Sequence, residues 1–260
     1  MSDLASDIRR ALIEDLRPAV DPAAFAEDQL GLKLDDWQQE FLDSASRRRL
    51  LNCARQSGKS TLAAVLALYR ALYYPDSLVL CVAPALRQSQ ELFAKVSGFY
   101  RMLDNPSPAL GDRKLALELA NGSRILTMPG SEKTIRGFSG VSLLLADEAA
   151  RIPDELHFSI RPMLAVSGGT LVLLSTPFGK SGTFWEEWSK GIGWDRYHVT
   201  AEQVDRIKPS FLAQERRTMP EAWFLQEYMA EFTEAEDAVF RGEDIDALLS
   251  DDVELLVVPD

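Results

Sequence analysis

Hydrophobic runs of strand length alternate with helix-like segments between about residues 50 and 200 of the chain. RLLNCA and SLVLCVAP are short apolar runs, and segments of helical periodicity follow them at residues 61–74 and 87–103. The later runs VSLLLADEAA and TLVLLSTP are continuous and end in polar residues, which is typical of parallel strands covered on both faces. This order of elements predicts an α/β fold with a doubly wound, mostly parallel sheet.

One antiparallel addition to this sheet is expected. In LALELANGSRILTM, two strand-like halves flank Asn121 and Gly122, and Asn-Gly is the strongest short signal for a β-hairpin. In open α/β sheets, ligands bind at the carboxyl ends of the strands. Functional residues are therefore expected directly after the apolar runs.

The first apolar run leads into a candidate phosphate-binding loop, ARQSGKST. Its triplet Gly58-Lys59-Ser60 matches the end of the pattern GxxxxGK[ST], although Cys53 stands where that pattern begins with glycine. In such a loop, backbone N–H groups and the helix N-terminus hold phosphate, the lysine reaches the β- and γ-phosphates, and the serine hydroxyl ligates Mg²⁺. A lone GKS is weak evidence, so the loop needs support from other strands.

Two further runs end in residues that suit the same chemistry. After LLLA, Asp147 would hold the magnesium shell and Glu148 would polarise the attacking water. Two adjacent carboxylates also mark a plain helix N-terminus, so this pair alone leaves both interpretations open. After LVLL, Ser175 and Thr176 could hydrogen-bond the γ-phosphate or the water and report hydrolysis. The three features in this order predict a P-loop ATPase of the kind with an added catalytic glutamate.

The charge of the chain limits its contacts with nucleic acid. With 28 basic and 40 acidic residues, the net charge is −12, which argues against a general phosphate-binding surface. Any such contact must be local, and the candidates are Arg47, Arg48 and Arg49 before the loop's strand and Arg216 and Arg217 on a later helix. A solvated charged face is the alternative for both groups.

The N-terminal segment and the cysteines indicate a cytoplasmic protein. Apolar residues recur every four positions from Leu4 to Leu16, as on one helical face, and the apolar region of a signal peptide is missing. The longest apolar stretches have about half of the roughly 20 residues that a membrane span needs. Cys53 and Cys81 lie in strand-like segments and are expected to be buried, reduced thiols.

Several motifs together resemble the large terminase subunits of tailed bacteriophages, the ATPases that pump DNA into procapsids. The resemblance runs from about Leu34 to Phe240. It rests on the deviant P-loop ARQSGKS, on CVAPALRQSQELF, on NGSRILTMPGSEKTIRGFSGVSLLLADEAAR with its arginine-glycine loop, and on LLSTPFGKSGTFWEEW. LDDWQQEFL is similar to the adenine-recognising Q motif, in which Gln38 would read the base edge, with a plain helix face as the alternative.

The resemblance implies a RecA- or helicase-like ATPase site with ATP and Mg²⁺ as cofactors. Its members would be Gln38, Arg55, Gln56, Ser57, Gly58, Lys59, Ser60 and Thr61 on the nucleotide, Ser60 and Asp147 on the metal, Glu148 as catalytic base, and Ser175 and Thr176 for coupling. Arg55 could contact the γ-phosphate in cis, or form a salt bridge that orients the loop. Arg136, in TIRGFSG, would act on a neighbouring subunit's ATP, or pin its own loop.

The resemblance also implies a domain organisation. Residues 1–33 would form an N-terminal helical segment, 34–194 the ATPase core, and 195–260 a small lid or linker subdomain with an acidic tail. The RNase H-type nuclease domain of the family, which uses two metals, does not fit in the remaining chain, so no DNA cleavage is expected. The late carboxylates Asp237, Asp244 and Asp246 are expected in a solvated linker.

The partners implied by the resemblance are those of a packaging motor. They are double-stranded DNA, the portal protein, the small terminase subunit and further copies of the chain in a ring on the procapsid. A pentamer is the expectation for that ring, and a monomer for the isolated chain. The implied location is the cytoplasm of the infected bacterial host.

Two other functions stay open. A superfamily 2 helicase or another DNA translocase shares these motifs, but it would need a second RecA-like domain, for which 260 residues leave no room. A non-hydrolysing assembly module would use nucleotide only to set its shape. Magnesium-dependent hydrolysis that requires Glu148 would exclude the assembly module, and strand separation would favour the helicase.

Overall fold

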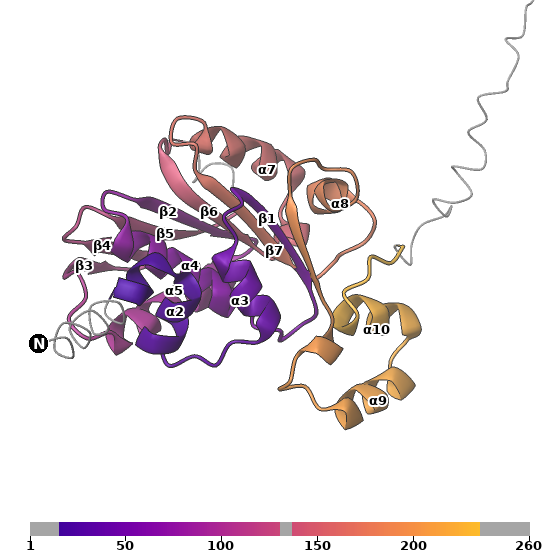
Figure 1. The fold of residues 1–260 in the computed structure, drawn as a ribbon. Coiled ribbons are helices and arrows are strands. Elements are labelled where there is room, and N and C mark those ends of the chain that lie inside the picture. The colour runs from indigo at the N-terminus through magenta and orange to yellow at the C-terminus, as the bar shows by residue number, and fades with distance from the viewer. Residues whose placement is uncertain (1–15, 131–136, 235–260) are drawn as a thin grey trace, which may run out of the picture.

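The computed structural model describes residues 16–130 and 137–234 and confirms the α/β fold. Over those residues, an eight-stranded sheet has the order β3-β4-β5-β2-β6-β7-β1-β8 (Figure 1). The strands are β1 Arg48–Cys53, β2 Leu78–Ala83, β3 Ala109–Arg113, β4 Ala116–Leu119, β5 Arg124–Pro129, β6 Val141–Asp147, β7 Thr170–Ser175 and β8 Asp195–Val199. From β5 to β8 in this order all pairs are parallel, so the sheet is mostly parallel, as predicted.

The antiparallel part of the sheet lies at one edge. β4 and β5 form the hairpin predicted around Asn121 and Gly122, with Leu117 opposite Ile125. Gly122 has φ +85°, the left-handed conformation that this turn requires. β3 pairs with β4 as a further antiparallel strand, which the sequence did not predict because ALGDR has no apolar alternation.

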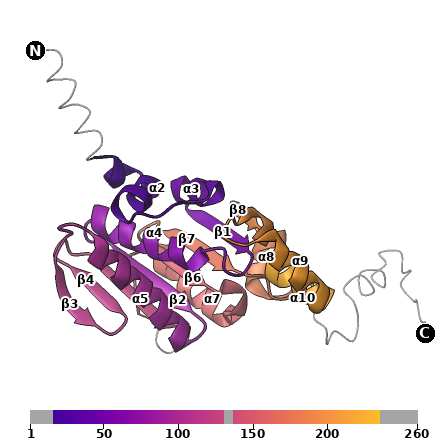
Figure 2. The ribbon, with the colours of Figure 1, turned by 90° about the horizontal axis from the view of Figure 1, so that it is seen from below.

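Helices cover both faces of the sheet (Figure 1). One face carries α2 Pro22–Ala24, the π-helical turn η1 Phe25–Gln29, α3 Asp36–Asp43, α4 Lys59–Tyr73 and α5 Leu86–Met102. The other face carries α7 Asp154–Ile160, the 3₁₀ turn η3 Arg161–Leu164 and α8 Gly182–Ser189. Figure 2 shows α4 and α5 lying across the strands on the first face, where they correspond to the two helices that periodicity predicts.

The central strands are buried on both sides. In β2, Val79 packs into the cluster shared with α4 and α5, whereas its neighbour Leu80 packs into the cluster shared with α7. Because both faces of each strand are covered, these strands have no polar alternation. Cys53 and Cys81 lie within the strands as buried free thiols, as predicted.

A small helical subdomain, here called the lid, follows the last strand and lies beside the β8 end of the sheet (Figure 2). It consists of the 3₁₀ turn η4 Ala201–Gln203, α9 Pro209–Thr218 and α10 Glu221–Tyr228. After α10 the chain returns to β1, where Asn52 Nδ2 donates to the Ala230 carbonyl at 2.7 Å. The Arg55 N–H donates to the Glu227 carbonyl at 2.9 Å. The lid is therefore joined to the strand that precedes the phosphate-binding loop.

Arg49, a candidate for nucleic-acid contact, has partners within the protein. Its guanidinium donates to the carbonyls of Phe41 at 3.0 Å and Ser46 at 3.1 Å, at and beyond the end of α3. Burial lowers the pKa of this guanidinium, although Tyr197 and Asp195 nearby favour its charged form. A solvated face therefore does not describe Arg49, and its contact with nucleic acid stays a prediction.

Across the described ranges, no helix is long and apolar enough to cross a lipid bilayer. The N-terminal positions Leu4, Ile8 and Leu12 and the late carboxylates from Asp237 onward lie outside the described residues. The predictions for these segments stay predictions.

Candidate nucleotide-binding and hydrolysis site

The phosphate-binding loop connects β1 to α4, which begins at Lys59. Gly58 has φ +102°, and a Cβ there would lie 2.9 Å from Gln38 Nε2, so both conformation and space require glycine. Gln56 also has a positive φ, of 57°. The loop thus turns sharply into the α4 N-terminus, whose free N–H groups suit an anion.

Gln38 supports this loop from α3. Its Oε1 accepts the Asp35 N–H at 3.0 Å, which caps α3, and its Nε2 donates to the Ser57 carbonyl at 3.3 Å. Arg206 of the lid reaches the same Ser57 carbonyl at 3.0 Å and pairs with Asp35 at 3.1 Å. Gln38 is 4% exposed, with both ends of its amide engaged inside the protein. That it reads the base stays a prediction.

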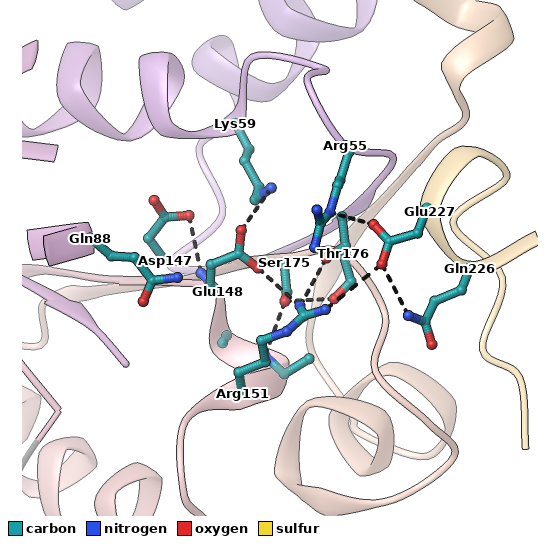
Figure 3. Close-up of polar contacts among 12 residues, drawn as sticks. Arg55, Lys59, Gln88, Asp147, Glu148, Arg151, Ser175, Thr176, Gln226 and Glu227 are labelled. Atoms are coloured by element: carbon teal, nitrogen blue, oxygen red, sulfur yellow. Dashed lines mark hydrogen bonds and ion pairs between the residues drawn. The ribbon is translucent and has the colours of Figure 1, made fainter. Parts of the chain in front are cut away.

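The loop and the acid pair lie together at the carboxyl ends of β1 and β6 (Figure 3). Lys59 Nζ lies 3.1 Å from Glu148 Oε1, and Ser60 Oγ donates to Asp147 Oδ2 at 2.8 Å. Glu148 has φ +53°, and its N–H donates to Asp147 Oδ1 at 3.0 Å. A left-handed non-glycine residue costs about 1–3 kcal/mol and occurs mostly where function holds it in place.

Burial controls the charges in this cluster. The Asp147 side chain is nearly inaccessible, and burial raises the pKa of its carboxyl, with Lys59 and the Ser60 hydroxyl acting in the other direction. Burial lowers the pKa of the Lys59 ammonium, but Cys53 and the nearby carboxylates of Glu148 and Asp147 together outweigh burial, so the pKa is raised. Lys59 is therefore a cation at neutral pH, held against two acids.

The β7 residues brace the segment that follows the acid pair. Ser175 Oγ accepts the Ala150 N–H at 3.1 Å and donates to the Thr176 carbonyl at 2.7 Å. Thr176 Oγ1 accepts from Arg151 Nη1 at 3.0 Å. Both side chains are buried beside the acid pair, so they are placed to sense a change there, and their coupling role stays a prediction.

Two residues that the sequence did not single out, Arg151 and Glu227, complete the site. Arg151 Nη1 lies 3.2 Å from Glu148 Oε2, and its Nη2 lies 4.0 Å from Glu227 Oε1. Arg55 forms an ion pair with Glu227 Oε2, so in this structure it contacts the lid (Figure 3). This geometry agrees with the salt-bridge interpretation of Arg55. Its contact with a γ-phosphate stays a prediction.

The donor set fits a small hard cation. A cavity of about 140 Å³ is lined by Ser60, Asp147 and Glu148, and by Gln88 and Lys95 of α5. Within the residues that the structure describes, no group of three or more His, Cys, Asp or Glu side chains could hold a metal. A hydroxyl and a carboxylate are the usual protein ligands of Mg²⁺ when substrate phosphates supply the rest.

α5 also lines this cavity, and the position of its first turn in the sequence could have predicted this. Gln88 lies in the first turn of α5, directly after the buried strand β2, and such turns lie at the ligand edge of parallel sheets. Arg136, expected in the loop before β6, lies outside the described residues. Its predicted action on a neighbouring subunit stays a prediction.

Three functional groups lie at the carboxyl ends of three parallel strands of one doubly wound sheet. They are the phosphate-binding loop at β1, the acid pair at β6 and the buried Ser-Thr pair at β7. This arrangement defines a P-loop nucleoside triphosphatase with an added glutamate. Residues 50–247 match the family described as the N-terminal part of the terminase large subunit of the T4-like virus type, and the chain belongs to this family.

Individual relatives agree with this assignment. The chain is 28% identical over 257 residues to the terminase large subunit of Thermus virus P23-45, covering 85% of this chain and 53% of the relative. It therefore spans about half the length of that relative. Among solved structures, the large terminase ATPase domain of Thermus phage P74-26 is 26% identical, with a TM-score of 0.66 over 80% of this chain and 97% of that domain. The large terminase of bacteriophage HK97 shares the fold, at 16% identity and a TM-score of 0.63 over 77% of this chain and 51% of that one.

Proposed function

We propose that this chain is the ATPase domain of a viral DNA-packaging motor, in which Mg²⁺-dependent ATP hydrolysis moves double-stranded DNA into a procapsid. The observation that carries the proposal is the convergence of Lys59 and Ser60 on Glu148 and Asp147, at 3.1 and 2.8 Å. Membership of the terminase family and the similarity to a solved terminase ATPase domain support it.

The contacts suggest how these residues act on a triphosphate. The β- and γ-phosphates would bind Lys59 and the N–H groups of the loop, and the Glu148 carboxylate, released from Lys59, would accept the proton of the attacking water. A bound Mg²⁺ would neutralise charge that develops on the phosphate oxygens. Ser60 and Asp147 are the residues that would hold it.

Motion would follow from the links between the acid pair and the lid. Glu148 contacts Arg151, which also contacts Thr176 and lies within ion-pair distance of Glu227 on α10. If Glu148 changed its partner, Arg151 would shift and would alter the contact with Glu227 of the lid. The DNA contact itself would be made mainly with phosphates, since a motor must move any base sequence.

The assembly that we propose is the one that the family resemblance implies. It is a ring of copies of this chain on the portal protein, supplied with DNA through the small terminase subunit, in the cytoplasm of the infected host. Arg136 of one copy would complete the site of the next, since an arginine supplied in trans is worth roughly 10³–10⁵ in rate in other nucleotide hydrolases.

The experiment that tests the chemistry compares Glu148→Gln with Glu155→Gln, an exposed glutamate on α7 that lies outside the cluster. Phosphate release from ATP should fall by about 10²–10⁴ in Glu148→Gln while nucleotide binding persists, because only the general base is lost. Glu155→Gln should hydrolyse ATP like the wild type. Unchanged hydrolysis in Glu148→Gln would remove Glu148 as the base, and wild-type protein that binds but never hydrolyses ATP, with or without Mg²⁺, would favour an assembly module.

A further inference from the structure

The order of the strands places the two ends of a nucleotide on opposite sides of the phosphate-binding loop. The acid pair follows β6, the loop follows β1, and the lid follows β8, in the sheet order β6-β7-β1-β8. The phosphate that reacts must lie at Glu148, on the β6 side of the loop. The nucleoside at the other end of the triphosphate is therefore directed toward β8 and the lid.

A cavity lies on that side of the loop. It has a volume of about 480 Å³ and is lined by Arg55 and Gln56 of the loop and by Ile207, Phe211 and Tyr228 of the lid. Arg206 and Lys208 add positive charge to its wall. We refer to it as the lid cavity. Its lining combines aromatic rings with cations, which suits a planar heterocycle attached to phosphates.

The aromatic pair is arranged for stacking. The rings of Phe211 and Tyr228 lie 6.0 Å apart between centroids and are nearly perpendicular, at 78°. Phe211 is 46% exposed, so part of its ring surface is available to a ligand. A base stacked on one ring would therefore turn its own edge toward the face of the other, an edge-to-face arrangement that aromatic groups prefer.

The residue expected to read the base is occupied elsewhere. Gln38 uses its Oε1 to cap α3 and its Nε2 to hold the Ser57 carbonyl, and it is buried. Arg206 fixes the same carbonyl from the lid side. To contact a base, Gln38 would have to give up a contact that shapes the loop, whereas the exposed ring of Phe211 can stack on a base while Tyr228 keeps its hydrogen bond to Glu215.

We propose that the lid cavity binds the nucleoside part of the nucleotide, mainly by stacking on Phe211 and Tyr228. This inference rests on the proposed function, since it takes the phosphate-binding loop as the site of the triphosphate. It adds a second binding element, contributed by the lid, for the base and ribose. Closure of the lid on the core is then favoured by the nucleoside as well as by the phosphates.

Isothermal titration calorimetry with two ligands separates these elements. ADP carries the nucleoside and inorganic pyrophosphate does not, so the ratio of their dissociation constants reports the contribution of the nucleoside. In Phe211→Ala and in Tyr228→Leu, the ADP affinity should fall about 5- to 150-fold while the pyrophosphate affinity is unchanged, because stacking of a base contributes about 1–3 kcal/mol. Tyr228→Phe keeps the ring and should keep the ADP affinity.

The controls distinguish a failed cavity from a failed phosphate site. Trp223→Ala removes another half-exposed ring of α10 that does not line the lid cavity, and it should leave both affinities unchanged. Lys59→Ala should lower the affinities for ADP and pyrophosphate by the same factor. If it lowers neither affinity, the proposed function fails. If the ring variants keep the full ADP preference, or if Gln38→Ala alone abolishes it, the lid cavity is not the nucleoside site and the proposed function is unaffected. Circular dichroism of each variant checks that it is folded.

Discussion

The Lys59 ammonium and the Glu148 carboxylate lie 3.1 Å apart and are each other's nearest opposite charge in the site. This pair joins the cation proposed to hold phosphate to the carboxylate proposed to activate water. A phosphate that binds Lys59 must therefore compete with Glu148 for it. If Glu148 is the general base, as we propose, its pairing with Lys59 would keep it from accepting a proton until a phosphate replaces it beside Lys59.

Removing the competing charge should strengthen nucleotide binding. We expect Glu148→Gln to bind ADP more tightly by about 1.5 kcal/mol, roughly tenfold, because Lys59 no longer exchanges one charged partner for another. Fluorescence or calorimetric titration of ADP measures this change, with Glu155→Gln as the control. Weaker binding in Glu148→Gln would indicate instead that the carboxylate helps to hold the nucleotide or its cation.

The same substitution should have opposite effects at two glycines. Gly58→Ala forces a Cβ into a left-handed residue at 2.9 Å from Gln38 Nε2, so we expect a loss of about 1–3 kcal/mol in the free energy of unfolding and a loss of nucleotide binding. Gly98→Ala, within α5 and with nothing within 4 Å of the added Cβ, should stabilise by about 0.5–1 kcal/mol. Urea denaturation gives both values, and equal signs would contradict the argument.

Glu227 should hold the lid on the core. Its side chain is nearly buried and lies between Arg55 and Arg151, so Glu227→Gln leaves two cations facing a neutral amide. We expect a loss of about 1–3 kcal/mol in the free energy of unfolding and faster hydrogen exchange in α10. Glu231→Gln, an exposed position just beyond α10, is the matched control. If the two variants are equally stable, the ion pairs of Glu227 do not hold the lid.

His157 should make stability fall in mildly acidic solution. Its Nε2–H donates to the Ala149 carbonyl at 3.0 Å, in the turn after the acid pair, and burial lowers the pKa of the ring. Below the unfolded-state pKa of about 6.5, the unfolded chain takes up a proton that the folded ring resists, so stability decreases as the pH falls. The loss can reach about 1.4 kcal/mol at pH 5.5.

A His157→Gln variant tests this titration, because glutamine keeps a donor and carries no charge. Its free energy of unfolding should change less than that of the wild type between about pH 7.5 and 5.5. Above about pH 7.5, the free energies of unfolding of the two proteins should depend on pH in the same way. Parallel curves throughout the range would show that the pKa of His157 does not differ between the folded and unfolded states.

Mixing experiments test whether Arg136 acts on a neighbour. Arg136→Ala and Glu148→Gln subunits, each expected to be nearly inactive alone, are mixed under conditions in which the ring assembles, and ATP hydrolysis is measured. A recovery of hydrolysis in the mixture is expected, because a Glu148→Gln copy would supply its Arg136 to the intact Glu148 of an Arg136→Ala neighbour. A mixture as inactive as its components would assign the arginine to its own subunit.

The backbone of the site could be predicted because its parts are local. The sequence around Lys59 contains a strand, a glycine-bearing loop and a helix start in one stretch, and Glu148 directly ends a buried run. The ends of parallel strands meet at one edge, so the positions of these residues follow from the fold class. The Asn121-Gly122 hairpin was predictable for the same reason, since its turn is encoded in two residues.

Contacts that join distant segments could not be predicted in this way. Glu227 reaches Arg55 because α10 returns to the end of β1, and no pattern around Glu227 distinguishes it from other helical glutamates. Arg151 is visible in the motif, but its contact with the lid depends on the same return. Arg49 resembled its exposed neighbours in sequence, and only the position of α3 makes it a partner of buried carbonyls.

The hydrogen bond from Asn52 to the Ala230 carbonyl, at 2.7 Å, ties the far end of the lid to the strand that feeds the phosphate-binding loop. Together with the backbone hydrogen bond from Arg55 to Glu227, it joins the C-terminal end of α10 to the start of the phosphate-binding loop. This junction allows little relative movement, because backbone groups and a short asparagine side chain have fewer rotatable bonds than long side chains do. A force that displaces the lid would therefore also displace the backbone of the phosphate-binding loop. Mechanical load on the lid would in this way change the geometry of the proposed nucleotide site.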